Sequence, residues 1–238
     1  MDKNPAPGPD FTHIETWVFD LDNTLYPATA NLFAQIDVRM KDFITRALGV
    51  EEAEAYRLQK HWYLTHGTTL AGLMREHAMG PHPFLDFVHD IDVSVLAPAP
   101  ALSAALERLP GRKVVFTNGT VAHATRVMER LGITHHMDGI FDIVHADFIP
   151  KPQVETFERF IARHGIAPAR AVMFEDLARN LKPAADMGMT TVLVVPPGGH
   201  ADPAVRVQEY GPQPPHVDHR TEDLTAFLLS LAVKDIAA

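Results

Sequence analysis

Two aspartates that stand two residues apart, Asp20 and Asp22, follow a short apolar run at residues 16–19. Such a run is typical of a buried strand, because it is β-prone and too short for a helix. Ligands of open parallel sheets bind beyond the carboxyl ends of the strands, so both carboxylates would stand where chemistry can occur. One of them could attack a phosphoryl group as a nucleophile. The alternative is an Asx turn, in which the two side chains only bind backbone groups.

Three further strand-like runs end in polar residues in the same way. The carboxyl ends of parallel strands meet at one edge of a sheet, so these side chains would converge there, which favours catalysis over a purely structural turn. The first of these runs, residues 113–116, is followed by a hydroxyl, an amide and the backbone N–H groups that open the next helix, a combination that suits an anion. The residues are Thr117, Asn118 and Gly119 after residues 113–116, Lys151 after residues 140–145, and Glu175 with Asp176 after residues 171–174.

Strand-like and helix-like stretches alternate along most of the chain. Helical spacing of apolar residues extends over residues 121–131, 154–164 and 177–187, and a glycine follows each stretch. Glycine directly after a helix is a common stop signal, because it accepts the left-handed conformation. With a further strand at residues 191–195, this alternation predicts an α/β fold, in which a parallel sheet is covered by helices on both faces.

Residues 28–96 interrupt the alternation, because they contain helical patterns and no convincing strand. Four helices of this length can form a small bundle with a core of its own. The sequence therefore predicts an inserted helical-bundle cap at residues 28–96, attached to a core made of residues 1–27 and 97–238. The expected helices cover residues 32–48, 51–64, 69–78 and 84–91.

Composition excludes several classes of protein. The 238 residues are 46% hydrophobic and 21% charged, as in an ordinary globular domain, and there is no cysteine for disulfides or thiolate metal sites. A formal net charge of -9 opposes binding to nucleic acid, which needs many Lys and Arg contacts with phosphates. Neither a signal peptide nor a membrane span is expected, so a cytoplasmic protein is predicted. A monomer or a homodimer is expected. The proline-rich residues 196–215 are expected to be an irregular surface segment.

The residues at the strand ends resemble, in order, the four motifs of the haloacid dehalogenase-like hydrolase superfamily. The resemblance covers nearly the whole chain and implies a Rossmann-like core, an aspartyl-phosphate intermediate and one Mg²⁺ ion. The helical insertion is similar to the cap that this superfamily places after its first motif. The motif residues are Asp20 to Thr24 (DLDNT), Thr117 with Asn118, Lys151, and Glu175 with Asp176 and Asn180.

The resemblance implies that Asp20 is the nucleophile and that Asp22 is the general acid and base. Asp22 would protonate the leaving ester oxygen and then take a proton from the hydrolytic water, as general acid–base residues do. The Mg²⁺ ligands would be Asp20, the backbone carbonyl of Asp22, and Asp176, and Glu175 would be a further ligand or hold a bound water. The metal-free dehalogenases of the superfamily lack an aspartate at the position of Asp22, so this residue favours phosphoryl transfer.

The remaining motif residues would stabilise charge. Thr117, Asn118 and Gly119 would bind the phosphoryl oxygens, and Lys151 would offset the negative charge that Asp20 shares with phosphate. Asn180 would support the metal carboxylates through its amide. Its alternative and compatible role is that of a helix cap, with Pro183 in the first turn of the helix. Catalysis would then consist mainly of electrostatic positioning.

Residues 20–27 (DLDNTLYP) and 63–73 narrow the resemblance to the pyrimidine 5′-nucleotidase branch, which hydrolyses nucleoside monophosphates such as UMP and CMP. On this basis Tyr63, His66 and Thr69 would contact the base or the sugar from the cap. Aromatic and β-branched residues in a helical bundle more often serve packing, so both interpretations stay open.

Other functions use the same parts. A sugar-phosphate phosphatase or a β-phosphoglucomutase-like phosphotransferase would keep every motif residue, and a non-catalytic phosphate-sensing scaffold would keep the fold. His123, early in the helix after Asn118, is expected either on the helix surface or in contact with the substrate. Arg179 is expected to be a surface charge.

Overall fold

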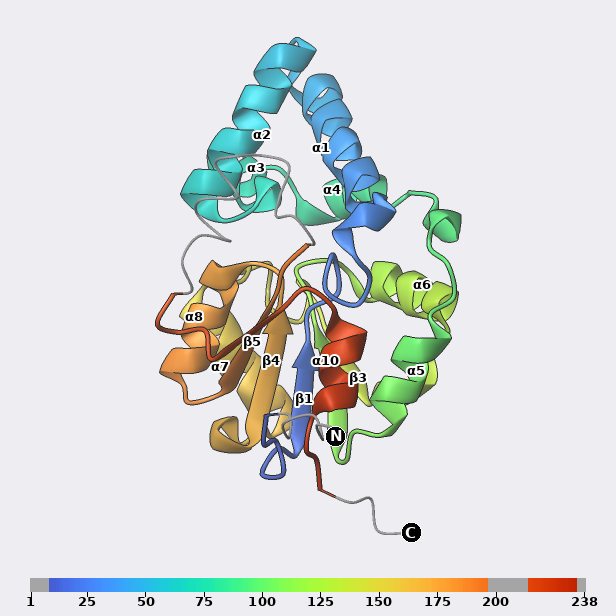
Figure 1. Cartoon of the computed structure of the whole chain (residues 1–238). Helices are drawn as coiled ribbons and strands as arrows, with labels where there is room; N and C mark the ends of the chain where they lie inside the picture. Colours follow the sequence, from blue (N-terminus) through green and yellow to red (C-terminus); the bar gives the residue numbers. More distant parts are fainter. Residues whose placement is uncertain (1–8, 197–213, 235–238) are drawn as a thin grey trace.

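The computed structural model describes residues 9–196 and 214–234, and the sheet lies at its centre (Figure 1). Six strands of the described residues form one sheet in the order β3-β2-β1-β4-β5-β6, and all neighbouring pairs are parallel. This arrangement confirms the predicted α/β, Rossmann-like fold. The strands are β1 (Thr16–Phe19), β2 (Arg112–Phe116), β3 (Gly139–Phe141), β4 (Ala171–Glu175), β5 (Thr190–Val194) and β6 (His219–Thr221).

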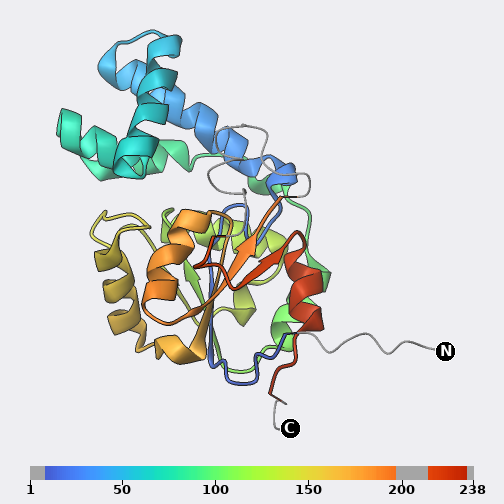
Figure 2. The same ribbon diagram turned by 60° about the vertical axis from the view of Figure 1, so that its left-hand side comes forward.

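Helices cover both faces of the sheet (Figure 2). Successive side chains of a strand point to opposite faces. Trp17 and Phe19 accordingly belong to one cluster of buried apolar residues, and Val18 belongs to the other. The first cluster includes side chains of α5 (Pro100–Glu107), α6 (Val121–Leu131) and α10 (Leu224–Ser230). The second includes side chains of α7 (Val154–His164) and α8 (Ala178–Asp186).

The predicted ends of α6 and α7 are confirmed. Gly132 and Gly165 follow them with φ angles of 76° and 59°, in the left-handed region. The predicted strand at residues 140–145 is wrong beyond Phe141. Asp142 ends β3, because its carboxylate accepts hydrogen bonds from the backbone N–H groups of Val121 and His145, both at 2.9 Å. The chain therefore turns here toward the start of α6.

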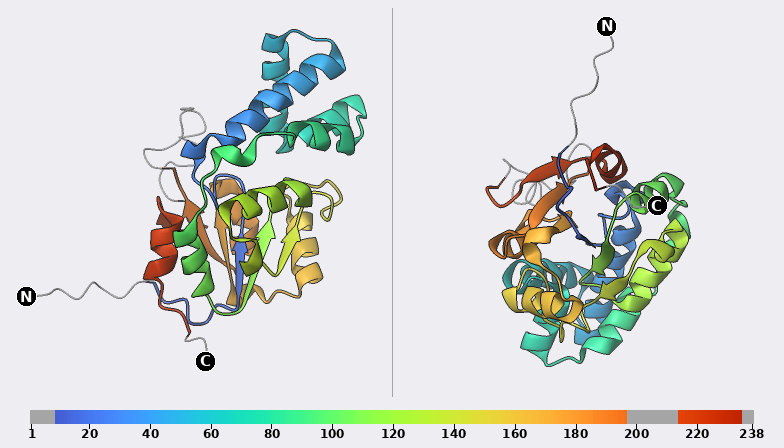
Figure 3. Two further views of the ribbon diagram at one scale, coloured as in Figure 1. Left: turned by 90° about the vertical axis from the view of Figure 1, so that its right-hand side faces the viewer. Right: turned by 90° about the horizontal axis from the view of Figure 1, so that it is seen from below.

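The four predicted helices of the insertion are present and lie beyond the carboxyl ends of the strands (Figures 1 and 3). They are α1 (Leu32–Leu48), α2 (Glu52–His66), α3 (Thr69–His77) and α4 (Pro81–Val88), called the helical segment below. Their buried side chains, among them Ile36, Trp62 and Phe84, form one continuous apolar cluster with those of α5 and α6, and a separate core of the four helices stays a prediction. No helix of the described ranges is long and apolar enough to cross a lipid bilayer.

Short 3-10 helices connect these elements. They are η1 (Ala28–Ala30), η2 (Val93–Val95), η3 (Thr134–His136) and η4 (Pro168–Arg170). Most of the proline-rich stretch, residues 197–213, falls outside the described residues, so the expectation for residues 196–215 stays a prediction.

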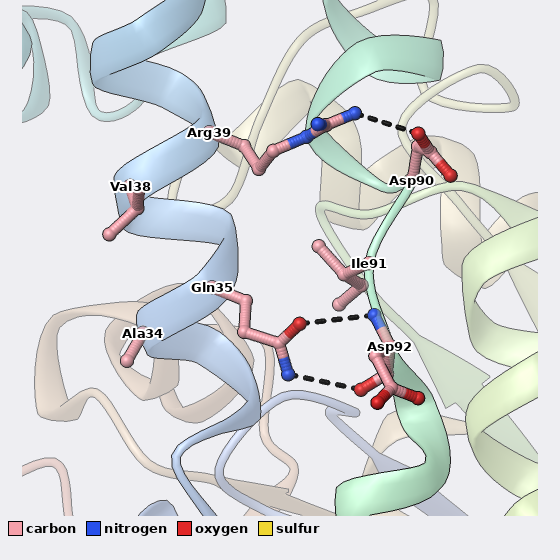
Figure 4. Close-up of a pocket in the computed structure, with 7 residues that line it drawn as sticks. All are labelled: Ala34, Gln35, Val38, Arg39, Asp90, Ile91 and Asp92. Carbon is pink, nitrogen blue, oxygen red and sulfur yellow. Dashed lines mark hydrogen bonds and ion pairs between the residues drawn. The ribbon is translucent and has the colours of Figure 1, made fainter.

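Residues 89–99, called the return segment below, lead from the helical segment back to the sheet. Gln35 of α1 holds them by two bonds with the backbone of Asp92: it accepts from the N–H and donates to the carbonyl, both at 3.0 Å. Arg39 bonds Asp90 at 2.8 Å, and a cavity of about 500 Å³ lies between these contacts (Figure 4). No predicted site residue lines this cavity, which belongs to the connection between α1 and the return segment.

Candidate active site

Pairing of β1 with β4 brings the first and the fourth motif together. Phe19 is paired with Phe174, and the backbone N–H of Asp20 continues the ladder with a 2.9 Å bond to the carbonyl of Phe174. Asp20 and Glu175 therefore leave the ends of adjacent strands side by side. The predicted convergence of the strand ends at the carboxyl edge of the sheet is met for these residues.

Lys151 lies between the carboxylates of Asp20 and Glu175. Its Nζ atom donates to Asp20 Oδ1 at 2.7 Å, to Glu175 Oε2 at 2.7 Å and to the carbonyl of Phe116 at 2.9 Å. An ammonium group has three hydrogens, so these bonds use all of its donors. The side chain is buried, and the two carboxylates hold its pKa above the ordinary value even though burial opposes this. Lys151 is therefore a fixed positive charge at this edge.

Asn118 holds the backbone of Lys151. Its Oδ1 atom accepts from the Lys151 N–H at 2.9 Å, and its Nδ2 atom donates to the Lys151 carbonyl at 3.4 Å. The amide predicted to bind phosphate is thus engaged with its neighbour, and its contact with a phosphoryl oxygen stays a prediction. The structure assigns it a second task, the placement of Lys151.

Asp20, Glu175 and Asp176 form a buried acidic cluster. One ligand atom of each lies within 4.8 Å of the others. Burial and the neighbouring Glu175 raise the pKa of Asp20 to about 7, and the same two causes raise the pKa of Asp176. Three buried carboxylates next to one lysine leave uncompensated negative charge, which is costly in an apolar interior. Oxygen donors at this spacing fit a hard divalent cation such as Mg²⁺.

Two amides support this cluster. Asn180 donates to Glu175 Oε1 at 3.1 Å, as expected for a residue that holds the metal carboxylates. Its alternative role as the cap of α8 is wrong, because the helix begins at Ala178 and Leu177 is the N-cap. Pro183 accordingly lies inside this helix and not in its first turn. Asn23, which was not predicted, donates to Asp176 Oδ2 at 3.4 Å.

Asp22 lies in a different environment from Asp20. Its Oδ1 atom accepts from the hydroxyl of Tyr26 at 2.6 Å and lies 2.9 Å from Nε2 of His123. Burial would raise the pKa of Asp22, but His123 and Tyr26 together hold it below the ordinary value. The prediction of a surface position for His123 is wrong, since its side chain is completely buried. Tyr26 was not predicted as a site residue. Its place four residues after Asp22, in the same turn-rich loop, is the sequence signal that could have indicated this contact.

Thr117 lies at the end of β2, where its hydroxyl accepts from the N–H of Gly119 at 2.9 Å. The hydrogen of that hydroxyl can still be donated to a ligand. The N–H of Gly119, expected to bind an anion, is directed to Thr117, and its contact with a phosphoryl oxygen stays a prediction. The N–H of Val121 is likewise bound to Asp142. Of the predicted anion site, the hydroxyl of Thr117 is therefore the clearest donor.

Comparison with known proteins decides the family. The family model of haloacid dehalogenase-like hydrolases matches residues 14–188, which is well over half of the chain and contains every motif described above. This chain belongs to the haloacid dehalogenase-like hydrolases.

Two known phosphate-related proteins are similar to this chain in sequence. Phosphate metabolism protein 8 of Saccharomyces cerevisiae is 29% identical over 211 residues, which are 81% of this hydrolase and 65% of the yeast protein. The chain thus spans slightly less than two thirds of that relative. Glyceraldehyde 3-phosphate phosphatase of Methanothermobacter thermautotrophicus is 25% identical over 189 residues, 74% of this chain and 83% of that one.

Solved structures of the family share the fold. A HAD phosphatase from Thermococcus onnurineus has a TM-score of 0.56 at 18% identity, covering 89% of this chain and 94% of its own. The hydrolase YfnB from Bacillus subtilis, solved with magnesium bound, has a TM-score of 0.53 at 13% identity, covering 90% and 96%. At these identities the likeness concerns the fold alone.

The helical segment of this hydrolase reaches the carboxyl edge at two places. The ring of Tyr63 in α2 lies 4.1 Å below the guanidinium of Arg179 in α8, so Arg179 is more than a surface charge. Gly67, with φ at 86°, ends α2 directly over Lys151: a Cβ atom there would lie 3.8 Å from the carbonyl of Lys151. That distance is an ordinary contact, so the turn with its positive φ is what requires glycine here.

The other predicted cap residues have partners or positions inside the helical segment. Nε2 of His66 lies 2.8 Å from Glu76 of α3, and Thr69 is buried at the first turn of α3. Thr68 caps the same helix by accepting from the N–H of Ala71 at 3.1 Å. Substrate contacts by His66 and Thr69 stay predictions, and Tyr63 is the one of the three that reaches the core.

Proposed function

We propose that this hydrolase is a Mg²⁺-dependent phosphomonoesterase that works through a covalent phosphate ester on Asp20. One observation carries the proposal. Asp20 stands at the end of β1 with Lys151 at 2.7 Å and two further buried carboxylates beside it, while Asp22, two residues on, has separate partners. A nucleophile and a proton-transfer group in separate environments are what stepwise ester hydrolysis requires.

The chain's own residues divide the task. Asp20 attacks phosphorus, and Lys151 and the hydroxyl of Thr117 stabilise negative charge on the transferring group. Asp22 gives a proton to the leaving oxygen and later takes one from water. Mg²⁺, held by Asp20, Asp176, the backbone carbonyl of Asp22 and either Glu175 or a water that Glu175 binds, would reduce repulsion between the carboxylates and the phosphate.

We further propose that residues 28–96 act as a cap on a core of residues 1–27 and 97–238. The proposal is supported by the position of α1 to α4 over the carboxyl ends of the strands (Figure 3). A cover at this place would exclude water from the reacting phosphate. It would also contact the part of the substrate that is not phosphate, and so select a small phosphorylated metabolite.

As substrate we propose a pyrimidine nucleoside 5′-monophosphate such as UMP or CMP. The aromatic ring of Tyr63 beside Arg179, where α2 meets α8, supports the binding of a planar group next to this pair. A second candidate is a sugar phosphate, which the similarity to an archaeal glyceraldehyde 3-phosphate phosphatase favours. The two classes differ in the presence of a nucleobase.

Phosphate release from a panel of esters tests these proposals. UMP, CMP, glyceraldehyde 3-phosphate and glucose 1-phosphate are each incubated with Mg²⁺ or with EDTA. Release from UMP and CMP that EDTA abolishes supports the nucleotidase, and release from the sugar phosphates alone supports the second candidate. Isomerisation of glucose 1-phosphate would indicate a phosphotransferase instead. No release from any ester in the presence of Mg²⁺ would overturn the phosphatase proposal.

A further inference from the structure

We propose that His123 is a positioning residue that aims the carboxylate of Asp22 at the ester oxygen of the substrate. The inference rests on the proposed function and adds a residue to it. The imidazole of His123 is completely buried, and its Nε2 atom lies 2.9 Å from Asp22 Oδ1. The two residues come from β1's exit loop and from α6, which are 101 positions apart in the chain.

Both partners of Asp22 bind the same oxygen. The hydroxyl of Tyr26 donates to Oδ1 at 2.6 Å, and His123 approaches Oδ1 as well. Within the described residues, no hydrogen bond reaches Oδ2. Two contacts on one oxygen fix the rotation of the carboxylate and leave the other oxygen for proton transfer. The side chain of Asp22 is 15% exposed, so Oδ2 is the oxygen that a ligand can meet.

The imidazole of His123 is itself held on several sides. Thr120 caps α6 by accepting from the backbone N–H of His123 at 3.2 Å. The ring of His89 stacks on the His123 ring, with centroids 4.6 Å apart and planes 13° apart. On another side, a Cβ atom at Gly119 would lie 3.2 Å from Cδ2 of the ring, so the absence of a side chain at Gly119 leaves room for it. The imidazole is thus locked in the orientation that meets Asp22.

His89 belongs to the return segment, which α6 also holds. Arg126 of α6 donates to the carbonyls of His89 and Ile91, at 3.0 and 2.6 Å. The stack of His89 on His123 is therefore anchored at the backbone of its own segment. Through this contact the placement of Asp22 depends on the connection between the helical segment and the sheet.

The proton transfer that His123 would align is the one to the leaving ester oxygen of the substrate. An oxygen of Asp20 forms a bond to phosphorus, the bond between phosphorus and the ester oxygen breaks, and its electron pair stays on that oxygen. The phosphate ester enters as its monoanion, and its proton passes through Asp22 Oδ2 to the same oxygen, so an alcohol leaves. An alkoxide is a poor leaving group and needs this proton, whereas p-nitrophenolate leaves without it. Misplacement of Asp22 must therefore penalise alkyl esters more than p-nitrophenyl phosphate.

The test compares kcat/KM for n-propyl phosphate and p-nitrophenyl phosphate in the full-length protein with Mg²⁺. This parameter reports the steps up to the departure of the alcohol and not the later hydrolysis of the intermediate. His123→Phe keeps a ring that can stack on His89 and removes the bond to Asp22. We expect it to lower kcat/KM for the propyl ester by about 10- to 100-fold, the range for loss of one bond to a charged group, and for the aryl ester by about threefold.

Two controls separate positioning from general damage. His135→Phe makes the same chemical change at an exposed histidine and should leave both values as they are. His123→Gln, whose amide can reach the position of Nε2, should recover at least a third of the wild-type value for the propyl ester. If His123→Phe does not fold, Tyr26→Phe removes the other donor to Oδ1 and His123→Gln replaces the first. In that case Tyr26→Phe is expected to lose activity on the propyl ester alone. His123→Gln, which keeps a donor to Oδ1, is expected to retain at least a third of the wild-type value.

Equal losses on the two esters, or none, would overturn the role of His123. Failure of the wild-type protein to release phosphate from both esters and from every ester of the panel above would instead overturn the proposed function, and this inference with it. The two failures are distinguishable, because the first leaves an active wild-type enzyme.

Discussion

The carboxyl edge of the sheet and the helical segment above it treat buried polar groups in opposite ways. At the edge, three carboxylates surround one lysine, and the pKa of Asp20 is raised to about 7 by burial and by Glu175. In the helical segment, the buried polar side chains are the uncharged Gln59 and Thr69, and Gln59 donates to Asp37 at 2.8 Å. Unbalanced buried charge is costly and is tolerated mainly where function uses it. We therefore expect the chemistry at the edge and the selection of the substrate by the helices.

Replacement of the nucleophile should have the largest effect on activity. Asp20→Asn keeps the size of the side chain but removes the attacking carboxylate, so phosphate release should fall by at least about 10³-fold. The change also removes one of three crowded carboxylates, and the melting temperature of the metal-free protein should stay within a few degrees. Phosphate assays and thermal denaturation measure the two. Asp186→Asn, at an exposed position in α8, is the control; a turnover of Asp20→Asn equal to that of this control would contradict the assignment.

Removal of Lys151 should damage both activity and stability. Lys151→Met leaves Asp20 and Glu175 buried without their cation, and loss of one partner of a buried pair typically costs about 3–5 kcal/mol. Urea denaturation at pH 8 measures the free energy of unfolding. The double variant Asp20→Asn with Lys151→Met should regain part of it, because one of the stranded charges is gone. A double variant less stable than Lys151→Met alone would argue against charge imbalance as the cause.

Magnesium should stabilise the protein, and more so at higher pH. The folded-state pKa of Asp20, about 7, lies above its unfolded value of 3.8, so the metal-free folded protein binds more protons between these values. Asp20 therefore costs stability as the pH rises through this range. Mg²⁺ competes with that proton, so its stabilisation should grow from pH 6 to pH 8, to about 2.7 kcal/mol at 100 times its Kd.

Thermal denaturation with Mg²⁺ or EDTA at the two pH values checks this dependence. Asp20→Asn should lose most of the stabilisation by Mg²⁺ and its increase with pH. A stabilisation that is the same at pH 6 and pH 8 would mean that the cation does not displace a proton from this cluster. Ca²⁺ is a useful comparison, since it prefers longer bonds and more ligands than Mg²⁺.

Much of the edge was predictable from sequence, because Asp20 and Thr117 directly follow a short apolar strand and Glu175 ends one. The register of β1 with β4 then brings Asp20 next to Glu175 without further information. The surroundings of Asp22 were not predictable in this way. His123 is a polar residue on an amphipathic helix, and its burial depends on a stack with His89, which lies in another element. The sequence shows periodicity along one helix, but not which segment covers a given face of it.

The ends of some elements were also beyond reach of the sequence. The run after Gly139 reads as strand up to His145, yet Asp142 diverts the chain by binding the N–H of Val121, 21 residues earlier. The engagement of Asn118 with the backbone of Lys151 is equally non-local. Hydrogen bonds of this kind depend on tertiary placement, so local patterns do not predict them.

The helical segment should affect affinity for the substrate and leave the chemical step nearly unchanged. α2 offers a matched pair: the ring of Tyr63 faces Arg179 of the core at 4.1 Å, and the ring of Tyr56 faces Lys60 of its own helix at 5.2 Å. A cation–π contact contributes about 0.5–2 kcal/mol. Tyr63→Leu should therefore raise KM for the best substrate by about three- to tenfold with kcat within twofold, and Tyr56→Leu should change neither. If Tyr63→Leu lowers kcat and leaves KM alone, the tyrosine acts on the chemistry at the edge and the division between the two regions is wrong.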